Sequence, residues 1–182
     1  MKVEETKFRR VYIITPDVFE DKRGYLFELY NSKKYEFLRL SRFVQENQTF
    51  SIKNTIRGVH MQKQPYSQAK LVNVVKGKIM AVCVDLREKS ETFGRHISLE
   101  MPEDEHKQLF VPEGIAFGFA TLSEESIVLY KLSKPYHPES QIGIRFDDPN
   151  LNINWMVNEP ILSDKDLKLF SFREAIKLIK EI

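Results

Sequence analysis

The feature that most constrains the fold is a succession of short apolar and aromatic runs, each closed by a turn signal. Residues 11–15 end at Pro16, and Lys76-Gly77-Lys78 has the form of a hairpin turn between two such runs. Turn signals recur roughly every 8 to 12 residues, which is typical of an all-β sandwich or barrel. The helices that a parallel sheet requires between its strands do not appear in the pattern. We therefore predict a mainly β chain, a jelly-roll barrel with short peripheral helices and a cavity open at one end.

The C-terminal segment departs from this pattern. Ser171 and Glu174 have the spacing of a capping box. The apolar residues after Ser171 recur at helical intervals: Phe172, Ala175, Ile176, Ile179 and Ile182. Residues 170–182 are therefore predicted to form an amphipathic helix that packs on the body or on a partner. A short helix capped by Ser32 is also expected. At 182 residues, the whole chain (1–182) is predicted to be a single domain.

Composition narrows the classes of function. Hydrophobic residues make up 42% of the chain, and the net charge of +2 argues against a dedicated nucleic-acid binder, which would carry a basic stripe. The single cysteine, Cys83, excludes an internal disulfide framework and fits a reducing compartment. The N-terminal residues are charged, unlike a signal peptide, and no apolar run reaches the roughly 20 residues that span a bilayer. We expect a cytoplasmic protein with no membrane or nucleic-acid partner.

Residues 57–62 concentrate side chains that can do chemistry. Strand alternation places Gly58, His60 and Gln62 on one face and Val59 and Met61 on the other. A polar face on a strand that should help to form a core indicates a lined cavity. A lone histidine is nevertheless more often an ordinary packed residue than a functional one, so His60 needs support from the rest of the chain.

The sequence does not predict a metal site. The four histidines show no His-x-His or His-x-x-x-His pairing that would supply a set of nitrogen ligands. Besides His60 they lie in polar or loop contexts: His96, His106 and His137. We therefore predict neither a catalytic metal nor another cofactor, and a metal-binding barrel is the less favoured interpretation.

An ordered set of segments resembles the dTDP-4-dehydrorhamnose 3,5-epimerase family, the cupin-type enzymes of dTDP-rhamnose synthesis. The set extends from about residue 12 to residue 170, and its order is far more specific than any single member. The segments are residues 21–28, 43–47, 57–62, 69–72, 82–87, 112–114, 129–131 and 162–166.

The resemblance implies a cupin-like jelly roll that epimerises a nucleotide-linked 4-keto-6-deoxy sugar. The leading substrate is dTDP-4-dehydro-6-deoxyglucose, inverted at C3 and C5. A relative that inverts only C3 or only C5 is the close alternative, and a non-catalytic protein that binds a sugar nucleotide is another. The family is dimeric, and an edge strand such as residues 11–15 would gain by pairing across a dimer. We expect a homodimer.

The resemblance also assigns roles to four residues. Inverting a carbon beside a ketone requires a base on one face and an acid on the other. His60 is similar to the family's base, and Asp166 to the carboxylate that fixes the tautomer of that base. Tyr130 matches the proton donor of the opposite face. Lys70 matches the cation beside the 4-keto oxygen, where negative charge develops.

A further group of residues is similar to those that bind the nucleotide in this family. Guanidinium groups suit phosphate oxygens, so the arginines are expected at the diphosphate. The amides and the acid are expected at the thymine, ribose or diphosphate, and one phenyl ring is expected to stack on the base. These residues are Arg23, Arg57, Glu28, Gln45, Asn47 and Phe19.

Three positions differ from the family pattern. Phe117 stands where the family usually has a histidine, Ala81 where it commonly has an aspartate, and Gln48 where it often has a histidine. The family's aspartate and first histidine are thought to form a polar pair, and losing both leaves no buried partner unsatisfied. We therefore expect an apolar cavity floor in this chain. The change bears on the identity of the sugar and the number of carbons inverted.

Overall fold

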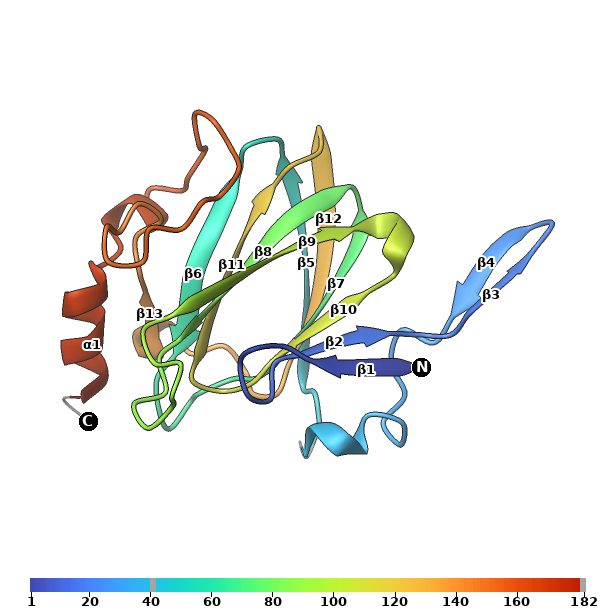
Figure 1. Cartoon of the computed structure of the whole chain (residues 1–182), viewed down its shortest axis with the longest axis horizontal. Helices are drawn as coiled ribbons and strands as arrows, with labels where there is room; N and C mark the ends of the chain where they lie inside the picture. The colour runs from blue at the N-terminus through green and yellow to red at the C-terminus, as the bar shows by residue number, and fades with distance from the viewer. Residues whose placement is uncertain (40–41, 181–182) are drawn as a thin grey trace.

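The computed structural model describes residues 1–39 and 42–180 and contains two antiparallel sheets that face each other (Figure 1). The six-stranded sheet has the order β1 (Lys2–Glu5), β2 (Tyr12–Thr15), β10 (Gln108–Val111), β7 (Lys70–Lys76), β12 (Glu125–Leu132), β5 (Gln45–Ile52). The five-stranded sheet has the order β13 (Gln141–Gly143), β6 (Ile56–Gln62), β11 (Ile115–Thr121), β8 (Lys78–Asp85), β9 (His96–Pro102). The predicted jelly-roll class is confirmed.

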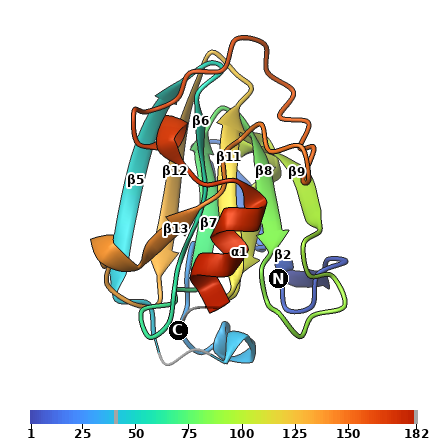
Figure 2. The ribbon, with the colours of Figure 1, turned by 90° about the vertical axis from the view of Figure 1, so that its left-hand side faces the viewer.

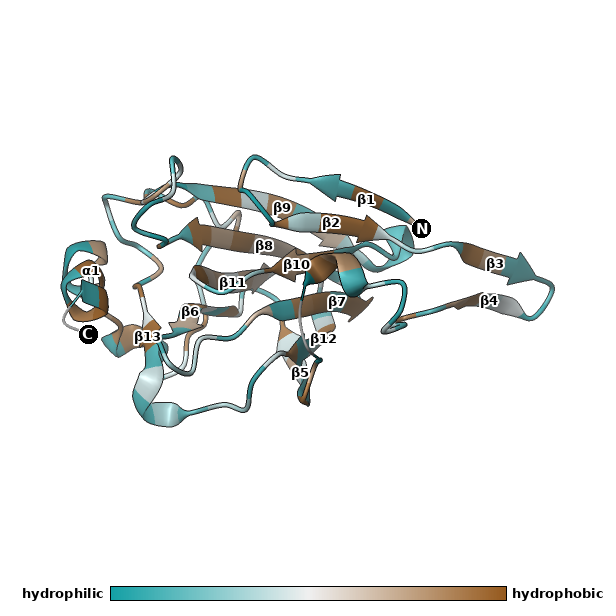
Figure 3. Cartoon of the chain, turned by 90° about the horizontal axis from the view of Figure 1, so that it is seen from below, coloured by the Kyte–Doolittle hydropathy of each residue, from teal (hydrophilic) through white to brown (hydrophobic). Residues whose placement is uncertain are grey.

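Alternation along the strands divides the apolar residues among three cores. On β8, Ala81 and Cys83 face the space between the sheets, whereas Val82 and Val84 face outward. The outward face is covered by the C-terminal segment, including Trp155. The outer face of the six-stranded sheet is covered by the segment around Tyr35 and Leu38. In Figure 3 the strands β7, β8, β10 and β11 are largely brown (hydrophobic), whereas the turn of the hairpin formed by residues 18–27 is teal (hydrophilic).

The C-terminal helix α1 (Phe172–Lys180) packs on the outer face of the five-stranded sheet (Figure 2). The capping box is present, because the Ser171 backbone N–H donates to Glu174 Oε2 at 2.8 Å. The Phe172 N–H donates to Asp148 Oδ2 at 2.8 Å and so ties the helix to a loop. Ile182, which the sequence pattern included in this helix, lies outside the described residues. No helix among those described has the length and hydrophobicity needed to cross a membrane.

The other helical segments are short 3₁₀ turns. They are η1 (Glu36–Leu38), η2 (Glu103–Glu105), η3 (Pro138–Ser140) and η4 (Asp166–Lys168). The expected cap at Ser32 is wrong, because η1 begins later and its N-cap residue, Tyr35, makes no side-chain capping bond. The neighbouring Asn31 instead accepts the backbone N–H of Lys33 at 3.2 Å.

A two-stranded hairpin, β3 (Val18–Asp21) and β4 (Gly24–Phe27), projects from the body at the right of Figure 1. Its turn is held by local residues: Asp21 Oδ1 accepts the backbone N–H of Arg23 at 2.8 Å, and Gly24 has a φ of 127°. The hairpin exposes large apolar side chains, with Phe19 at 65% and Leu26 at 66%. Such exposure on a projecting arm indicates a contact surface.

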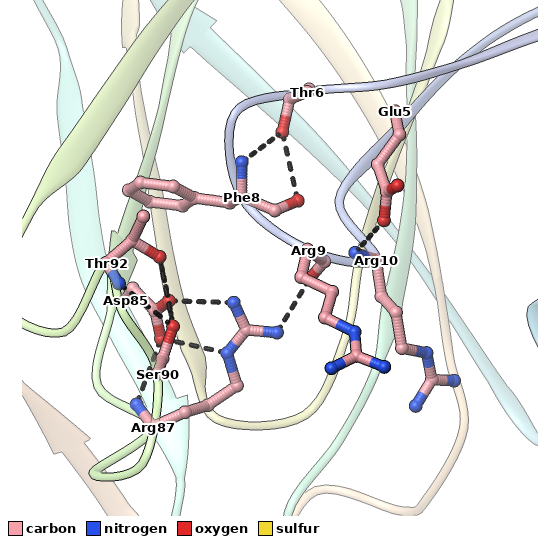
Figure 4. A network of polar contacts seen from close by, with 9 residues as sticks. All are labelled: Glu5, Thr6, Phe8, Arg9, Arg10, Asp85, Arg87, Ser90 and Thr92. Carbon is pink, nitrogen blue, oxygen red and sulfur yellow. Dashed lines mark hydrogen bonds and ion pairs between the residues drawn. The ribbon is translucent and has the colours of Figure 1, made fainter.

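A buried carboxylate anchors the N-terminal segment to the barrel (Figure 4). Asp85 accepts two hydrogen bonds from the Arg87 guanidinium, at 2.9 and 2.7 Å, one from the Arg87 backbone N–H at 3.0 Å, and others from Ser90 and Thr92. Burial opposes ionisation of Asp85, but these donors outweigh it and hold its pKa at about 2. Arg87 is thereby oriented to donate to the backbone carbonyl of Arg9 at 2.7 Å. The network fixes the segment that leads through β2 to the hairpin.

Candidate active site

A cleft between the two sheets contains the residues that the resemblance assigned to catalysis. It consists of two adjoining cavities of about 300 and 270 Å³, both of which are lined by His60, Lys70, Tyr130 and Gln141. A larger cavity of about 460 Å³, near Arg87, contains none of these groups. The candidate active site is therefore identified by the side chains that line it and not by the volume of the cavity.

The imidazole of His60 and the carboxylate of Asp166 form a dyad, although the two residues are 106 positions apart. The Nε2–H of His60 donates to Asp166 Oδ1 at 2.5 Å, which leaves Nδ1 with its lone pair free. Ser163 Oγ donates to Asp166 Oδ2 at 3.0 Å and fixes the carboxylate. Burial alone would raise the pKa of Asp166, but the hydrogen bond and charge of His60, with Ser163 and Arg57, lower it. Asp166 is therefore an anion that orients the imidazole.

Lys70 and Tyr130 reach the same cleft from the opposite sheet. Lys70 begins β7, and Tyr130 lies on β12, where it pairs with Asn47 of β5 and Val72 of β7. Because β6 belongs to the other sheet, the imidazole stands across the cleft from the amine and the phenol. This arrangement places an imidazole and a phenol on opposite sides of one cavity.

The amine of Lys70 is buried and has no hydrogen-bond partner among the described residues. Burial lowers its pKa to about 8, and the neighbouring Cys83 makes only a smaller, opposing contribution. An unsatisfied ammonium in a cavity wall is a position for a ligand oxygen, because an acceptor there would remove the cost of leaving the donor unpaired.

Three of the residues predicted to bind the nucleotide also lie at the cleft. Gln45 and Asn47 share the inner face of β5, as their alternation predicts, and are joined by a 3.0 Å hydrogen bond. Arg57 lines the second cavity and is held by Ser51 Oγ at 2.9 Å and the Phe50 carbonyl at 3.0 Å.

The sequence reasoning missed a polar group at the cleft: Tyr136, Gln141 and Lys165. Lys165 Nζ donates to Gln141 Oε1 at 2.8 Å and to the Tyr136 hydroxyl at 3.1 Å. Gln141 pairs with Gln62 through β13, a strand too short to give a periodic signal. Lys165 lies in one of the family-like segments, but the resemblance gave a role only to its neighbour Asp166.

The remaining predicted binding residues do not lie at this cleft in the same chain. Phe19 and Arg23 belong to the projecting hairpin, and Glu28 follows it directly. Arg23 pairs with Asp21 at 2.6 Å, and Glu28 accepts a hydrogen bond from Asn31 at 2.9 Å. None of the three lines either cavity of the cleft.

The floor of the cleft is apolar, as the substitutions predict. Phe117 of β11 pairs in register with both His60 and Cys83, and Phe119 pairs with Ala81. All of these except His60 belong to the core between the sheets. Within the described ranges, no three histidine, cysteine, aspartate or glutamate side chains are grouped closely enough to hold a metal ion.

Comparison with known proteins identifies relatives over almost the entire chain. The family model for dTDP-4-dehydrorhamnose 3,5-epimerase matches residues 5–174. The dTDP-4-dehydrorhamnose 3,5-epimerase of Shigella flexneri is 40% identical over 177 residues, covering 96% of this chain and 98% of that protein. The enzyme of the same name from Methanothermobacter thermautotrophicus is 40% identical over 174 residues, covering 93% of this chain and 94% of the relative.

Solved structures agree with the sequence relatives. The Legionella pneumophila dTDP-6-deoxy-D-glucose-3,5-epimerase, in complex with dTDP-4-keto-L-rhamnose, superposes with a TM-score of 0.91 at 36% identity, covering 99% of this chain and 95% of that one. The Bacillus anthracis dTDP-4-dehydrorhamnose 3,5-epimerase, with TDP and PPi bound, gives a TM-score of 0.90 at 43% identity, covering 94% and 99%. The chain therefore belongs to the dTDP-4-dehydrorhamnose 3,5-epimerase family.

Proposed function

We propose that this protein converts dTDP-4-dehydro-6-deoxyglucose to dTDP-4-dehydrorhamnose by inverting C3 and C5. The observation that carries the proposal is the cleft, where the His60–Asp166 dyad faces Tyr130 and Lys70 across the two sheets. A base and an acid on opposite sides of a sugar ring are what inversion of a carbon requires.

The reaction begins with proton removal beside the ketone. The free Nδ1 of His60 takes the hydrogen of the carbon, and the C–H electrons move into the carbonyl to form an enolate. Asp166 stabilises the resulting imidazolium and holds its orientation. The enolate oxygen lies against the Lys70 ammonium, which gains the hydrogen-bond partner that it lacks in the empty cleft.

The second half of the reaction returns a proton to the other face of the same carbon. The Tyr130 hydroxyl donates this proton as the carbonyl re-forms, so the carbon is inverted. The imidazolium then loses its proton, and the phenolate regains one, by exchange with water. The sum is an isomerisation that needs no redox cofactor.

Exchange with heavy water tests this proposal. We expect one deuteron at C3 and one at C5 of the product, observed by NMR, because each inversion returns a proton from solvent-exchangeable groups. Exchange at a single carbon would instead support an enzyme that inverts only C3 or only C5. Nucleotide binding with no exchange would mean a non-catalytic sugar-nucleotide-binding protein.

We further propose that the enzyme works as a homodimer in the cytoplasm, with the hairpin of each chain completing the partner's cleft. The hairpin that carries Phe19 and Arg23 projects from the body (Figure 1), and both side chains are exposed. A neighbouring copy would cover the apolar side chains and bring a guanidinium to the diphosphate. The single cysteine, Cys83, is buried and fits a reducing compartment.

Mixed dimers test the shared cleft. Arg23→Ala alone should weaken substrate binding about 10-fold to 10²-fold, the value of a charge-assisted hydrogen bond, and His60→Ala alone should abolish turnover. If the hairpin serves the partner, co-refolding the two variants restores about a quarter of wild-type activity at low substrate, because one cleft in each mixed dimer is intact. No restoration would mean that each cleft is built from one chain. The control partner is Arg145→Lys, at an exposed arginine that lines neither cavity of the cleft.

A further inference from the structure

The charge of Lys70 is unusual for its surroundings. Its Nζ is buried within the cleft wall and has no hydrogen-bond partner in the part of the chain that the structure describes. The other buried catalytic charge, Asp166, has two partners, His60 and Ser163. The two buried charges therefore differ. The carboxylate of Asp166 already has hydrogen-bond partners, whereas the ammonium of Lys70 has none among the described residues.

The groups that surround Lys70 explain this difference. Cys83 of β8 lies close enough to interact with the amine electrostatically, and Phe117 of β11 lines the same cavity. The other titratable and charged groups that line the cavities with Lys70 are Arg57 and His60 of β6, Tyr130 of β12, Tyr136 after β12, Lys165, and Asp166, the first residue of η4.

None of these groups offers Lys70 a counter-charge. Arg57 and Lys165 are cations, and the one carboxylate, Asp166, is already bonded to His60 and Ser163. A carboxylate within about 4 to 6 Å would favour the ammonium form strongly, whereas Cys83 offsets the effect of burial only in small part and a phenyl ring carries no charge.

This inference rests on the proposed function. We propose that Cys83 and Phe117 are positioning residues, because they leave the Lys70 ammonium without a counter-charge. They thereby set the pH above which Lys70 loses the positive charge that stabilises the enolate. As the pH rises, Lys70 releases a proton to water and becomes a neutral amine. The neutral amine stabilises the enolate oxygen less than the ammonium does. The charged form is favoured again only when the enolate itself supplies the missing negative charge.

The lowered Lys70 pKa of about 8 gives this inference its range. We expect kcat/KM to fall above pH 8, because kcat/KM reports the ionisation of the free enzyme.

The direct test is an NMR titration of ligand-free protein labelled with ¹³C at the lysine ε-carbons. We expect one lysine signal with a midpoint near pH 8, well below the usual range of a lysine, and we expect this signal to be absent in Lys70→Arg. A Lys70 signal that titrates with the others would overturn the inference. The titration needs no substrate, so it succeeds or fails independently of the proposed reaction.

Two variants at Cys83 test the role of the floor. Cys83→Asp places a carboxylate of nearly the same size beside the amine, and we expect the midpoint and the alkaline limit of kcat/KM to rise together by at least one unit. Cys83→Ser, the neutral control, should change neither. In Lys70→Arg, whose guanidinium cannot lose its proton, the fall near pH 8 should vanish from whatever activity remains. A limit unmoved in both Cys83→Asp and Lys70→Arg would contradict the proposal.

Discussion

Replacing His60 with glutamine is expected to lower kcat about 10³-fold to 10⁴-fold, the upper range for a general base. The glutamine amide can still donate to Asp166, so the carboxylate keeps a partner and the cleft keeps its shape. It has no group that accepts a proton at neutral pH. We therefore expect affinity for dTDP to stay unchanged by calorimetry, while deuterium exchange at both C3 and C5 is lost together.

The matched control for this variant is His96→Gln. His96 lies on β9 and lines neither cavity of the cleft. Burial lowers its pKa, so it is neutral at pH 7 in the wild type, and its replacement should leave turnover intact. If His60→Gln retained a tenth of the activity or more, another group would have to be the base, and the dyad would be only a structural pair.

Periodicity in the sequence is sufficient to predict which residues face each layer of this fold. The alternation of β8 places Ala81 and Cys83 on one face and Val82 and Val84 on the other. Successive side chains of a strand point to opposite faces, and both faces of β8 are buried, each in a different core. Local sequence alone does not decide where the helices of this chain begin. Ser171 caps a helix, whereas Ser32 does not. Both side chains can accept the capping hydrogen bond, so the difference comes from the tertiary contacts that decide which segment becomes helical.

The site could not be assembled from local pattern alone. His60 and Asp166 meet across 106 positions, and only the resemblance connected them. Gln141 was missed because β13 is short and its place beside Gln62 follows from the sheet pairing. The direction of the hairpin that carries Arg23 depends on contacts beyond its own residues. The local residues Asp21 and Gly24 explain its turn but not the surface on which the hairpin packs.

The largest combined effect is expected from Lys70→Met, which should make the protein less active and more stable at once. Removing the electrophile should lower kcat about 10²-fold to 10³-fold, by analogy with the loss of an oxyanion-hole donor. Methionine has nearly the length of lysine and no charge, so it fills the same space among Cys83 and Phe117 without a buried ammonium.

The sign of the stability change follows from the lowered pKa of Lys70, which is 10.5 for an unperturbed lysine and about 8 in the folded protein. Between these values the unfolded chain binds more protons than the folded one, so wild-type stability rises with pH there. Below pH 8 the folded protein carries the full cost of the buried charge, about 3 kcal/mol at 1.36 kcal/mol for each pKa unit.

Lys70→Met should therefore raise the free energy of unfolding at pH 7 by about 3 kcal/mol and remove its rise between pH 8 and 10. Chemical denaturation at several pH values measures both, with the exposed Lys89→Met as the control that should show neither. If Lys70→Met were no more stable than wild type at pH 7, the amine would already be compensated in the empty cleft. The stability forgone at Lys70 is, on this argument, what keeps an unpaired cation ready for a charge that exists only during the reaction.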